Sequence, residues 1–393
     1  MEVQFDGFPA CEPGSRSLCL AAAQEHDTDA LRAALQAADV PFHEPFSAVL
    51  CFELTPESLR KASAWWSVLD RRELESIRCL LSDQREVPTV ARLMQSQRLS
   101  SLLAWMNGQW LLDVLRSNRL MTYFQPIVSA SDPNQVFAYE CLLRGQTREG
   151  GVISPYRLFT AARDTGLLKS LDAAARLTAI ACFQSSHAPA ETNVFINVNP
   201  RSLDDPCRNL HAAVQAILAS GLAPERFVFE LVESDQVTDF DNLLQILDFC
   251  REAGCRVALD DLGAGYNSLN LLAVMKPDFV KLDMDLIRDV DQDAYKGRVA
   301  GKLLELAKEL QVKTVAEGVE TAGEWQWVVH HGADYAQGYF FAKPAAVPPQ
   351  PEVQVPSRAV HAAEFGVSDS DAEVVAVGTD LGSKRRDMKG SDK

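Results

Sequence analysis

Short apolar runs alternate with amphipathic segments between Met121 and Pro344. Segments with the helical spacing of apolar residues, such as LHAAVQAIL and RVAGKLLELAKEL, separate most of these runs. Strands that alternate with helices favour βα units and a parallel sheet. Eight strands over about 225 residues fit a (β/α)8 barrel, and a doubly wound open sheet is the alternative. The predicted strands are TYFQPIV, VFAYECLL, NVFINV, FVFELV, RVALDD, FVKLD, KTVAEG and DYAQGYFF.

Three further regions flank this predicted barrel at 118–345. Residues 1–85 have the pattern of a small α/β domain, with SLCLAAA and FSAVLCFEL as strands and DTDALRAALQAAD as a helix between them. Residues 86–117 are predicted to form a helix with many apolar positions, either a connecting helix packed on its own chain or a signalling or dimerising helix. Residues 346–393 lack periodicity, and we expect a flexible tail there.

Composition and charge narrow the possible partners. Hydrophobic residues make up 47% of the chain and charged residues 23%, as in ordinary globular proteins. The net charge of −16 argues against broad binding to nucleic acid or to an anionic membrane, because both need basic surface. The nine cysteines include no C-x-x-C pair, and neither a signal peptide nor an apolar run of membrane length is present. We therefore expect a cytoplasmic protein with reduced thiols.

Polar residues stand at the ends of the predicted strands. In a βα barrel these carboxyl ends form one rim, so residues far apart in the sequence would meet there. A solvated strand terminus explains any one of them, but buried parallel strands otherwise read as continuous apolar runs. The strand-end residues are Glu140, Asn197, Glu230, Glu233, Asp260, Asp261, Lys281, Asp283, Glu317 and Gln337.

The doublet Asp260–Asp261 is the most unusual of these positions. Consecutive strand side chains point to opposite faces, so both can reach one target only if the strand ends and the backbone turns. Gly263 and Gly265 permit such a turn. Exposure to water or a bound metal could offset the repulsion between the two carboxylates.

The ligand types at the rim indicate which metal would fit. The strand-end positions offer carboxylates and an amide without His or Cys, and all-oxygen ligation suits Mg2+ or Mn2+. The carboxylates outnumber what one Mg2+ usually takes. Two ions about 4 Å apart, bridged by Asp260, would account for the doublet, and such sites serve in-line displacement at phosphorus.

Eight ordered motifs between about Leu120 and Pro344 resemble the EAL-domain family of bacterial cyclic di-GMP phosphodiesterases. They are YFQPIV, ECLLRG in place of the E-A-L-x-R signature, NVNPRSL, FELVES, DDLGAGYNSL, VKLD, VAEGVET and QGYFFAKP. The resemblance implies a barrel of the (β/α)8 type whose first strand runs antiparallel. It also implies metal-dependent hydrolysis of cyclic di-GMP to linear pGpG.

The resemblance assigns a role to each matching residue. A first metal would be held by Glu140, Asn197, Glu230 and Asp260, and a second by Asp260, Asp261 and Glu317. Lys281 would stabilise the attacking hydroxide, and Glu317 is also a candidate for the general base. Substrate contacts would come from Gln125, Leu142, Arg144 and Gln337. Glu233 would anchor the DDLGAGYNSL loop, which resembles a regulatory loop linked to dimerisation.

Three positions depart from the family pattern. Cys141 replaces the signature alanine, Leu262 replaces a phenylalanine, and Val232 stands where threonine is common. These changes remove no polar ligand, so we expect an enzyme that uses two Mg2+ or Mn2+ ions and is inhibited by Ca2+. The alternative is a catalytically weak cyclic di-GMP receptor or effector that signals through protein contacts. We further expect a homodimer, regulation by the N-terminal region, and a possible protein partner for that region.

Overall fold

The computed structural model describes most of the chain between Arg16 and Gln354. The described residues are 16–22, 24–66, 69–83, 96–186, 188–189, 191–199, 206–232, 240–263 and 268–354. The predicted loop anchor Glu233 and almost all of the predicted tail therefore lie outside the described residues.

The N-terminal domain is an antiparallel sheet with helices. The sheet order is β2-β3-β1-β4-β5, so β1 lies between β3 and β4 although β2 follows it in sequence. The order β-α-β-β-α-β along the chain, with a short helix before β4, gives this sheet the topology of ferredoxin-like folds. The elements are β1 (Arg16–Ala21), α1 (Glu25–Ala37), β2 (Phe42–Phe46), β3 (Val49–Glu53), α2 (Pro56–Trp66), α3 (Arg71–Ser76), β4 (Arg78–Asp83) and β5 (Gln97–Arg98).

Strand alternation divides the two faces of this sheet. Leu20 and Phe52 share a buried cluster with Leu31 of α1 and Trp66 of α2, which confirms an α/β domain ahead of the barrel. Cys19 points to the other face, opposite Cys51 in the register of β1 and β3, and the two form a disulfide. The disulfide corrects the expectation that the cysteines are reduced thiols. The sequence did not indicate it, because the two cysteines are 32 positions apart and only the strand register brings them together.

Two helices, α5 (Leu99–Gly108) and α6 (Trp110–Arg116), stand between the domain and the barrel. Leu99 and Trp105 of α5 join the core of the N-terminal domain. Leu111 and Val114 of α6 instead belong to a cluster with residues of α7 and α8 in the barrel region. The apolar positions of these helices are thus largely buried within the chain's own cores, and residues 84–95 lie outside the described part.

Eight strands close the barrel. Its order is β6-β14-β13-β12-β11-β10-β9-β7, and β6 also pairs with β7 to complete the ring. Only β6 runs antiparallel to both neighbours, as expected for the first strand, and the fold class is confirmed. The strands are β6 (Leu120–Ser129), β7 (Val136–Gln146), β9 (Asn193–Val198), β10 (Phe227–Val232), β11 (Arg256–Leu262), β12 (Phe279–Leu282), β13 (Lys313–Ala316) and β14 (Tyr335–Gln337), with β8 (Val152–Ile153) as an extra edge strand.

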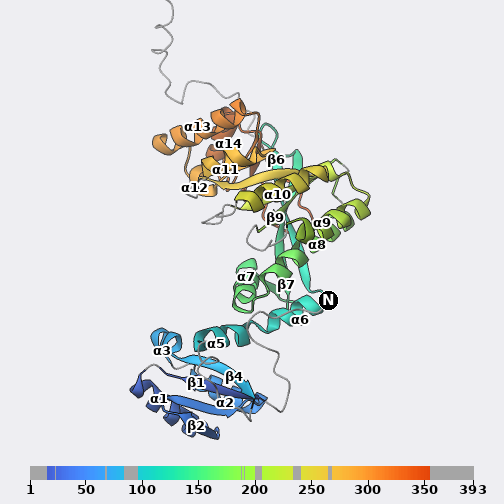
Figure 1. Cartoon of the computed structure of the whole chain (residues 1–393). Coiled ribbons are helices and arrows are strands. Elements are labelled where there is room, and N and C mark those ends of the chain that lie inside the picture. Colours follow the sequence, from blue (N-terminus) through green and yellow to red (C-terminus); the bar gives the residue numbers. More distant parts are fainter. Residues whose placement is uncertain are drawn as a thin grey trace, which may run out of the picture. The chain divides into compact units, whose positions relative to one another are not determined.

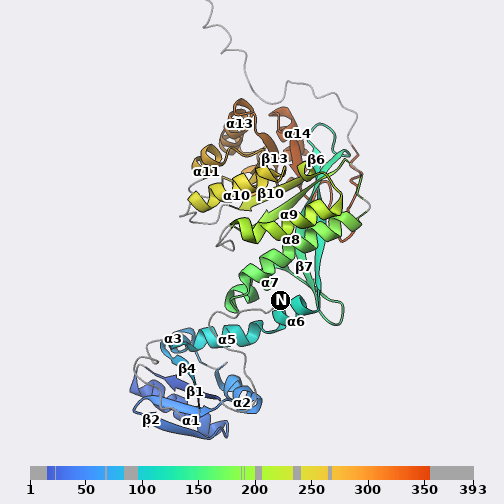
Figure 2. The same ribbon diagram turned by 45° about the vertical axis from the view of Figure 1, so that its right-hand side comes forward.

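Helices surround the barrel, as Figures 1 and 2 show, with α8 and α9 side by side. A buried cluster that includes Phe227, Leu259 and Val280 fills the space between strands and helices. The helices are α7 (Pro155–Asp164), α8 (Leu168–Ser185), α9 (Pro206–Ser220), the 3-10 turn η2 (Pro224–Arg226), α10 (Phe240–Glu252), α11 (Ser268–Met275), α12 (Met284–Ile287), α13 (Ala294–Glu309) and α14 (Ala322–His330).

The chain continues past the barrel along β6 and β7. Ala345 forms a pair of backbone hydrogen bonds with Phe124, and the Pro349 carbonyl accepts from the Tyr139 hydroxyl. Val353 and Asn134 are joined by two further hydrogen bonds. The first residues of the predicted tail are therefore held by the barrel. Among the helices described here, none has the length and apolar character that crossing a bilayer requires.

Candidate active site

The parallel register brings the predicted polar residues to one rim. Glu230 of β10 stands beside Asn197 of β9, and Asp260 of β11 stands beside Val232 at the end of β10. Glu140 of β7 lies opposite Gln125 of the antiparallel strand β6. Neighbouring strands that end together thus place these side chains around a common space.

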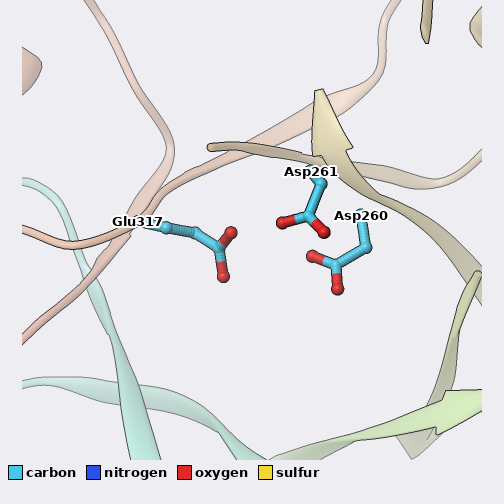
Figure 3. A group of neighbouring side chains, drawn as sticks. All are labelled: Asp260, Asp261 and Glu317. Atoms are coloured by element: carbon cyan, nitrogen blue, oxygen red, sulfur yellow. The ribbon is translucent and has the colours of Figure 1, made fainter. Parts of the chain in front are cut away.

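The doublet converges because the backbone of β11 departs from regular strand geometry. The register with β12 shifts between Leu259 and Leu262, so one extra residue is inserted there. Asp261 has a φ of 58°, in the left-handed region that residues other than glycine rarely adopt. Figure 3 shows the carboxylates of Asp260 and Asp261 directed toward the same space as that of Glu317. Gly263 follows with a φ of 106°, and a side chain there would collide with Leu286.

Lys281 lies at the centre of the acidic residues. The side chain of Lys281 is 1% exposed, and its Nζ lies 2.8 Å from Glu230 Oε1 and 2.8 Å from Glu317 Oε1. The same atom lies 2.9 Å from Asp260 Oδ1 and 3.6 Å from Glu140 Oε2. A buried ammonium with four carboxylates around it stays protonated, and they raise the pKa of Lys281 although burial alone would lower it. We call Lys281 and the five carboxylates of Glu140, Glu230, Asp260, Asp261 and Glu317 the acidic ring.

Two amide side chains hold Glu140 in place. Gln337 Nε2 donates to Glu140 Oε2 at 2.7 Å, and Asn197 Nδ2 donates to Glu140 Oε1 at 3.2 Å. By strand alternation Cys141 points away from the ring, and it is buried in the cluster under the helices. The exchange of the signature alanine for cysteine therefore leaves the ring unchanged.

Burial and mutual repulsion raise the proton affinity of the ring. Burial and the charge of the neighbouring Asp260 together raise the pKa of Glu317 to about 8 and that of Asp261 to about 6, although Lys281 acts in the opposite direction. The pKa of Glu230 is also raised, chiefly by burial. Protons therefore compensate part of the negative charge when no cation is bound.

The ring has the donors that a hard divalent cation requires. Asp260, Asp261 and Glu317 each offer an oxygen within 4.8 Å of the others. Among the residues that the structure describes, neither oxygen of the buried Glu230 has an aligned hydrogen bond, although Lys281 is close to one of them. Five carboxylates and one ammonium carry four negative charges when all are ionised, which two divalent cations would balance. The residues therefore fit a two-ion site.

The predicted substrate residues occupy β6, β7 and β14. Leu142 and Arg144 follow Glu140 at alternate positions and so share its face of β7. The Arg144 guanidinium lies over the ring of Tyr123, 5.1 Å from its centroid. Gln125 and Gln337 are buried beside Glu140.

The sequence did not indicate a cavity of about 390 Å3 beside the ring. Leu142 and Asn197 are among the residues that line it, and Phe159 lines the side formed by α7. Asp172 and Arg176 of α8, one helical turn apart, form a buried ion pair on its wall. The (i, i+4) spacing of Asp172 and Arg176 can be seen in the sequence. The position of this ion pair on the cavity wall depends on how α8 packs, which the sequence does not show.

Comparison with known proteins places the barrel in a family. The EAL domain family matches residues 109–344. The cyclic di-GMP phosphodiesterase NbdA of Pseudomonas aeruginosa is 30% identical over 241 residues, which cover 60% of this chain and 30% of that protein. The probable cyclic di-GMP phosphodiesterase PdeG of Escherichia coli is 28% identical, over 58% of this chain and 45% of that protein. The match thus spans less than half the length of either relative.

A solved structure extends the comparison to the fold. The standalone EAL protein from Vibrio cholerae O395, bound to cyclic di-GMP, is 29% identical and has a TM-score of 0.53. The alignment covers 59% of this chain and 95% of that one. With the family match over more than half of the chain and the same closed barrel, this chain belongs to the EAL domain family.

Proposed function

We propose that this chain hydrolyses one phosphodiester bond of cyclic di-GMP to give linear pGpG. The observation that carries the proposal is the acidic ring, in which four carboxylates surround one buried lysine and a fifth, Asp261, lies beside Asp260 and Glu317. The donor set suits two Mg2+ or Mn2+ ions, and such pairs serve displacement at phosphorus. The relatives named as cyclic di-GMP phosphodiesterases support the choice of substrate.

In this proposal each ring residue has a defined task. A first ion would be held by Glu140, Asn197, Glu230 and Asp260, and a second by Asp260, Asp261 and Glu317. When bound, the ions lower the pKa of the attacking water and offset charge on the phosphate. Lys281 Nζ would donate a hydrogen bond to the attacking oxygen. The same group holds the carboxylates of Glu230, Asp260 and Glu317 together.

The proton of the attacking water needs an acceptor at the rim. Glu317 fits this role, because its side chain is 16% exposed and lies at the open side of the ring. The product pGpG carries a 5′-phosphate, so the P–O3′ bond breaks, water supplies the new P–O bond, and O3′ leaves as a hydroxyl after gaining a proton.

Substrate recognition is proposed for residues next to the ring. Gln125, Leu142, Arg144 and Gln337 would contact the bases and phosphates. The neighbouring cavity of about 390 Å3 has room for one base. Leu142 and Phe159 give it an apolar wall on which a base could pack.

The metal dependence of pGpG formation tests the proposal. The full chain is incubated with cyclic di-GMP and Mg2+, Mn2+, Ca2+ or EDTA, and the products are separated by chromatography. We expect pGpG with Mg2+ or Mn2+, none with EDTA, and inhibition by excess Ca2+, whose longer and looser coordination misplaces the attacking oxygen. Equal turnover in EDTA would refute the two-ion reaction.

We also propose that the chain forms a homodimer and that the N-terminal domain regulates the barrel, with a protein partner as one possible input. The motive is that the N-terminal domain contributes no residue to the acidic ring. A truncated chain should begin at Gln109, because α6 packs with α7 and α8 in one cluster. A mass per particle equal to that of a single chain would refute the homodimer for the full chain, and the same turnover in the full and truncated chains would refute the regulation.

A further inference from the structure

Backbone hydrogen bonds join the carboxyl ends of β11 and β14 to two segments at the rim. These are the segment between β12 and α13 (283–293, the β12 loop, which includes the short helix α12) and the segment between β13 and α14 (317–321, the β13 loop). The Asp283 amide donates to the Leu262 carbonyl, and the Glu317 amide donates to the Leu282 carbonyl. The Val319 amide then donates to the Gln337 carbonyl. The position of Glu317 in the ring therefore depends on how firmly the β12 and β13 loops hold each other.

Glu324 joins these two loops from outside the ring. Its side chain is 1% exposed although it is a carboxylate. Oε1 accepts from the Asp289 amide in the β12 loop at 3.0 Å, whereas Oε2 accepts from the amides of Glu320 and Thr321 in the β13 loop at 2.8 and 3.0 Å. Arg288 Nη1 lies 3.7 Å from Oε1. Burial would raise the pKa of Glu324, but these amide donors and Arg288 lower it, so the group is ionised.

We propose that Glu324 is a positioning residue for the metal site, which acts by fixing the β13 loop, and with it Glu317, against the β12 loop that follows Lys281. The proposal rests on the two-ion function proposed above. It differs from a role in helix stability alone, because only one of the two oxygens belongs to the N-terminal cap of α14. The cap also includes Thr321, whose hydroxyl accepts from the Glu324 amide at 3.1 Å.

The two oxygens of Glu324 have different partners, so its role in the helix cap and its role in joining the loops can be tested separately. In Glu324→Gln the single carbonyl oxygen can keep the Glu320 and Thr321 amides, and the new NH2 group then faces the Asp289 amide and the Arg288 guanidinium. This variant keeps the cap and loses the link between the loops. In Thr321→Ala the cap is weakened, and the link through Oε1 to the Asp289 amide remains.

The test is calorimetric titration of Mn2+ into the full chain, in the wild type and both variants, with thermal unfolding in EDTA alongside. We expect Glu324→Gln to raise the dissociation constant for Mn2+ about tenfold, the lower end of the losses seen when groups behind metal ligands are removed. Thr321→Ala should lower Tm by about 2–4 °C and leave the dissociation constant unchanged. Turnover of Glu324→Gln should recover at saturating Mn2+, because its ring residues are intact.

Glu320→Gln serves as the surface control. Glu320 of the β13 loop also reaches the β12 loop, through a more exposed ion pair with Arg288 at 2.7 Å, and exposed pairs of this kind contribute little. This variant should bind Mn2+ as the wild type does. The inference is overturned if Glu324→Gln binds Mn2+ like the wild type, or if Thr321→Ala weakens binding as much. A wild type that binds no Mn2+ would instead refute the two-ion function, and the inference with it.

Discussion

The two ends of the barrel strands have opposite chemistry. At the carboxyl ends, the acidic ring gathers five carboxylates and a lysine. At the amino ends, Phe137, Phe195, Phe279 and Tyr335 close the barrel with aromatic rings, and Phe137 stacks on Tyr335 with centroids 3.8 Å apart. The same strands therefore serve stability at one end and, in the proposed function, the binding of metal and substrate at the other.

This difference has an energetic consequence. The aromatic end gains from burial and ring contacts without any ligand. The acidic ring costs stability when it is empty, because its carboxylates are buried close together and retain protons. Substitutions at the two ends should therefore separate activity from stability.

The largest expected effect follows the removal of the bridging carboxylate. Asp260→Asn should lower kcat for cyclic di-GMP about a thousandfold or more, because several kcal/mol of charge stabilisation are lost. Its stability to urea in EDTA should equal or exceed that of the wild type, since one repelling charge is gone. Rates of pGpG formation and urea unfolding of the same preparation measure both. Wild-type turnover in this variant would remove Asp260 from the metal site.

The matching substitution at the aromatic end should reverse this result. Phe279→Ala removes a buried ring that contacts Phe195 and should lower the free energy of unfolding by about 3–5 kcal/mol. The kcat of the folded fraction should stay near the wild-type value. A fall in kcat as steep as that of Asp260→Asn would show that the two ends are not independent.

The third prediction concerns how strongly Mn2+ stabilises the folded chain at different pH values. The folded-state pKa values of Glu317 and Asp261 are raised to about 8 and about 6, so between about pH 4 and 8 the folded chain binds more protons than the unfolded chain. Stability in EDTA should therefore fall as pH rises through this window. Bound Mn2+ replaces those protons, so the rise in Tm on adding Mn2+ should be larger at pH 8 than at pH 6. Thermal unfolding with and without Mn2+ measures it, and an equal rise at both pH values would contradict the prediction.

The smallest expected effect concerns one aromatic contact. The stacked pair Phe137–Tyr335 should show a coupling free energy of about 0.5–1.5 kcal/mol in a double-mutant cycle with leucine at each position. Metal affinity should be unaffected in all three variants. A coupling of zero would mean that closure of this end depends on area burial alone.

The sequence predicts the ring well because its signals are local. Glu230 interrupts an apolar run in β10, Glu317 follows the apolar end of β13, and Glu140 interrupts an apolar run within the longer strand β7. The barrel topology then brings the three residues together. The glycine after the doublet suggested a turn, but the left-handed conformation of Asp261 and the extra residue in β11 appear only in the structure.

Features that depend on packing between distant segments escaped the sequence reading. The short edge strand β2 contains a proline and no clean alternation, and the Cys19–Cys51 pair depends on the register of β1 and β3. Glu324 reads in sequence only as a helix cap residue, because its contact with Asp289 is made across 35 positions. Loop-to-loop contacts of this kind leave no periodic pattern.

A single-turnover experiment tests the central claim most directly. Full-length protein in excess over cyclic di-GMP, with saturating Mn2+, is stopped at successive times and the nucleotide is extracted and separated. The acidic ring as a two-ion hydrolytic site predicts complete conversion of the bound cyclic di-GMP to pGpG, and no conversion by Asp260→Asn under the same conditions. Cyclic di-GMP that stays bound and intact on the wild-type chain would contradict the claim and identify a receptor instead.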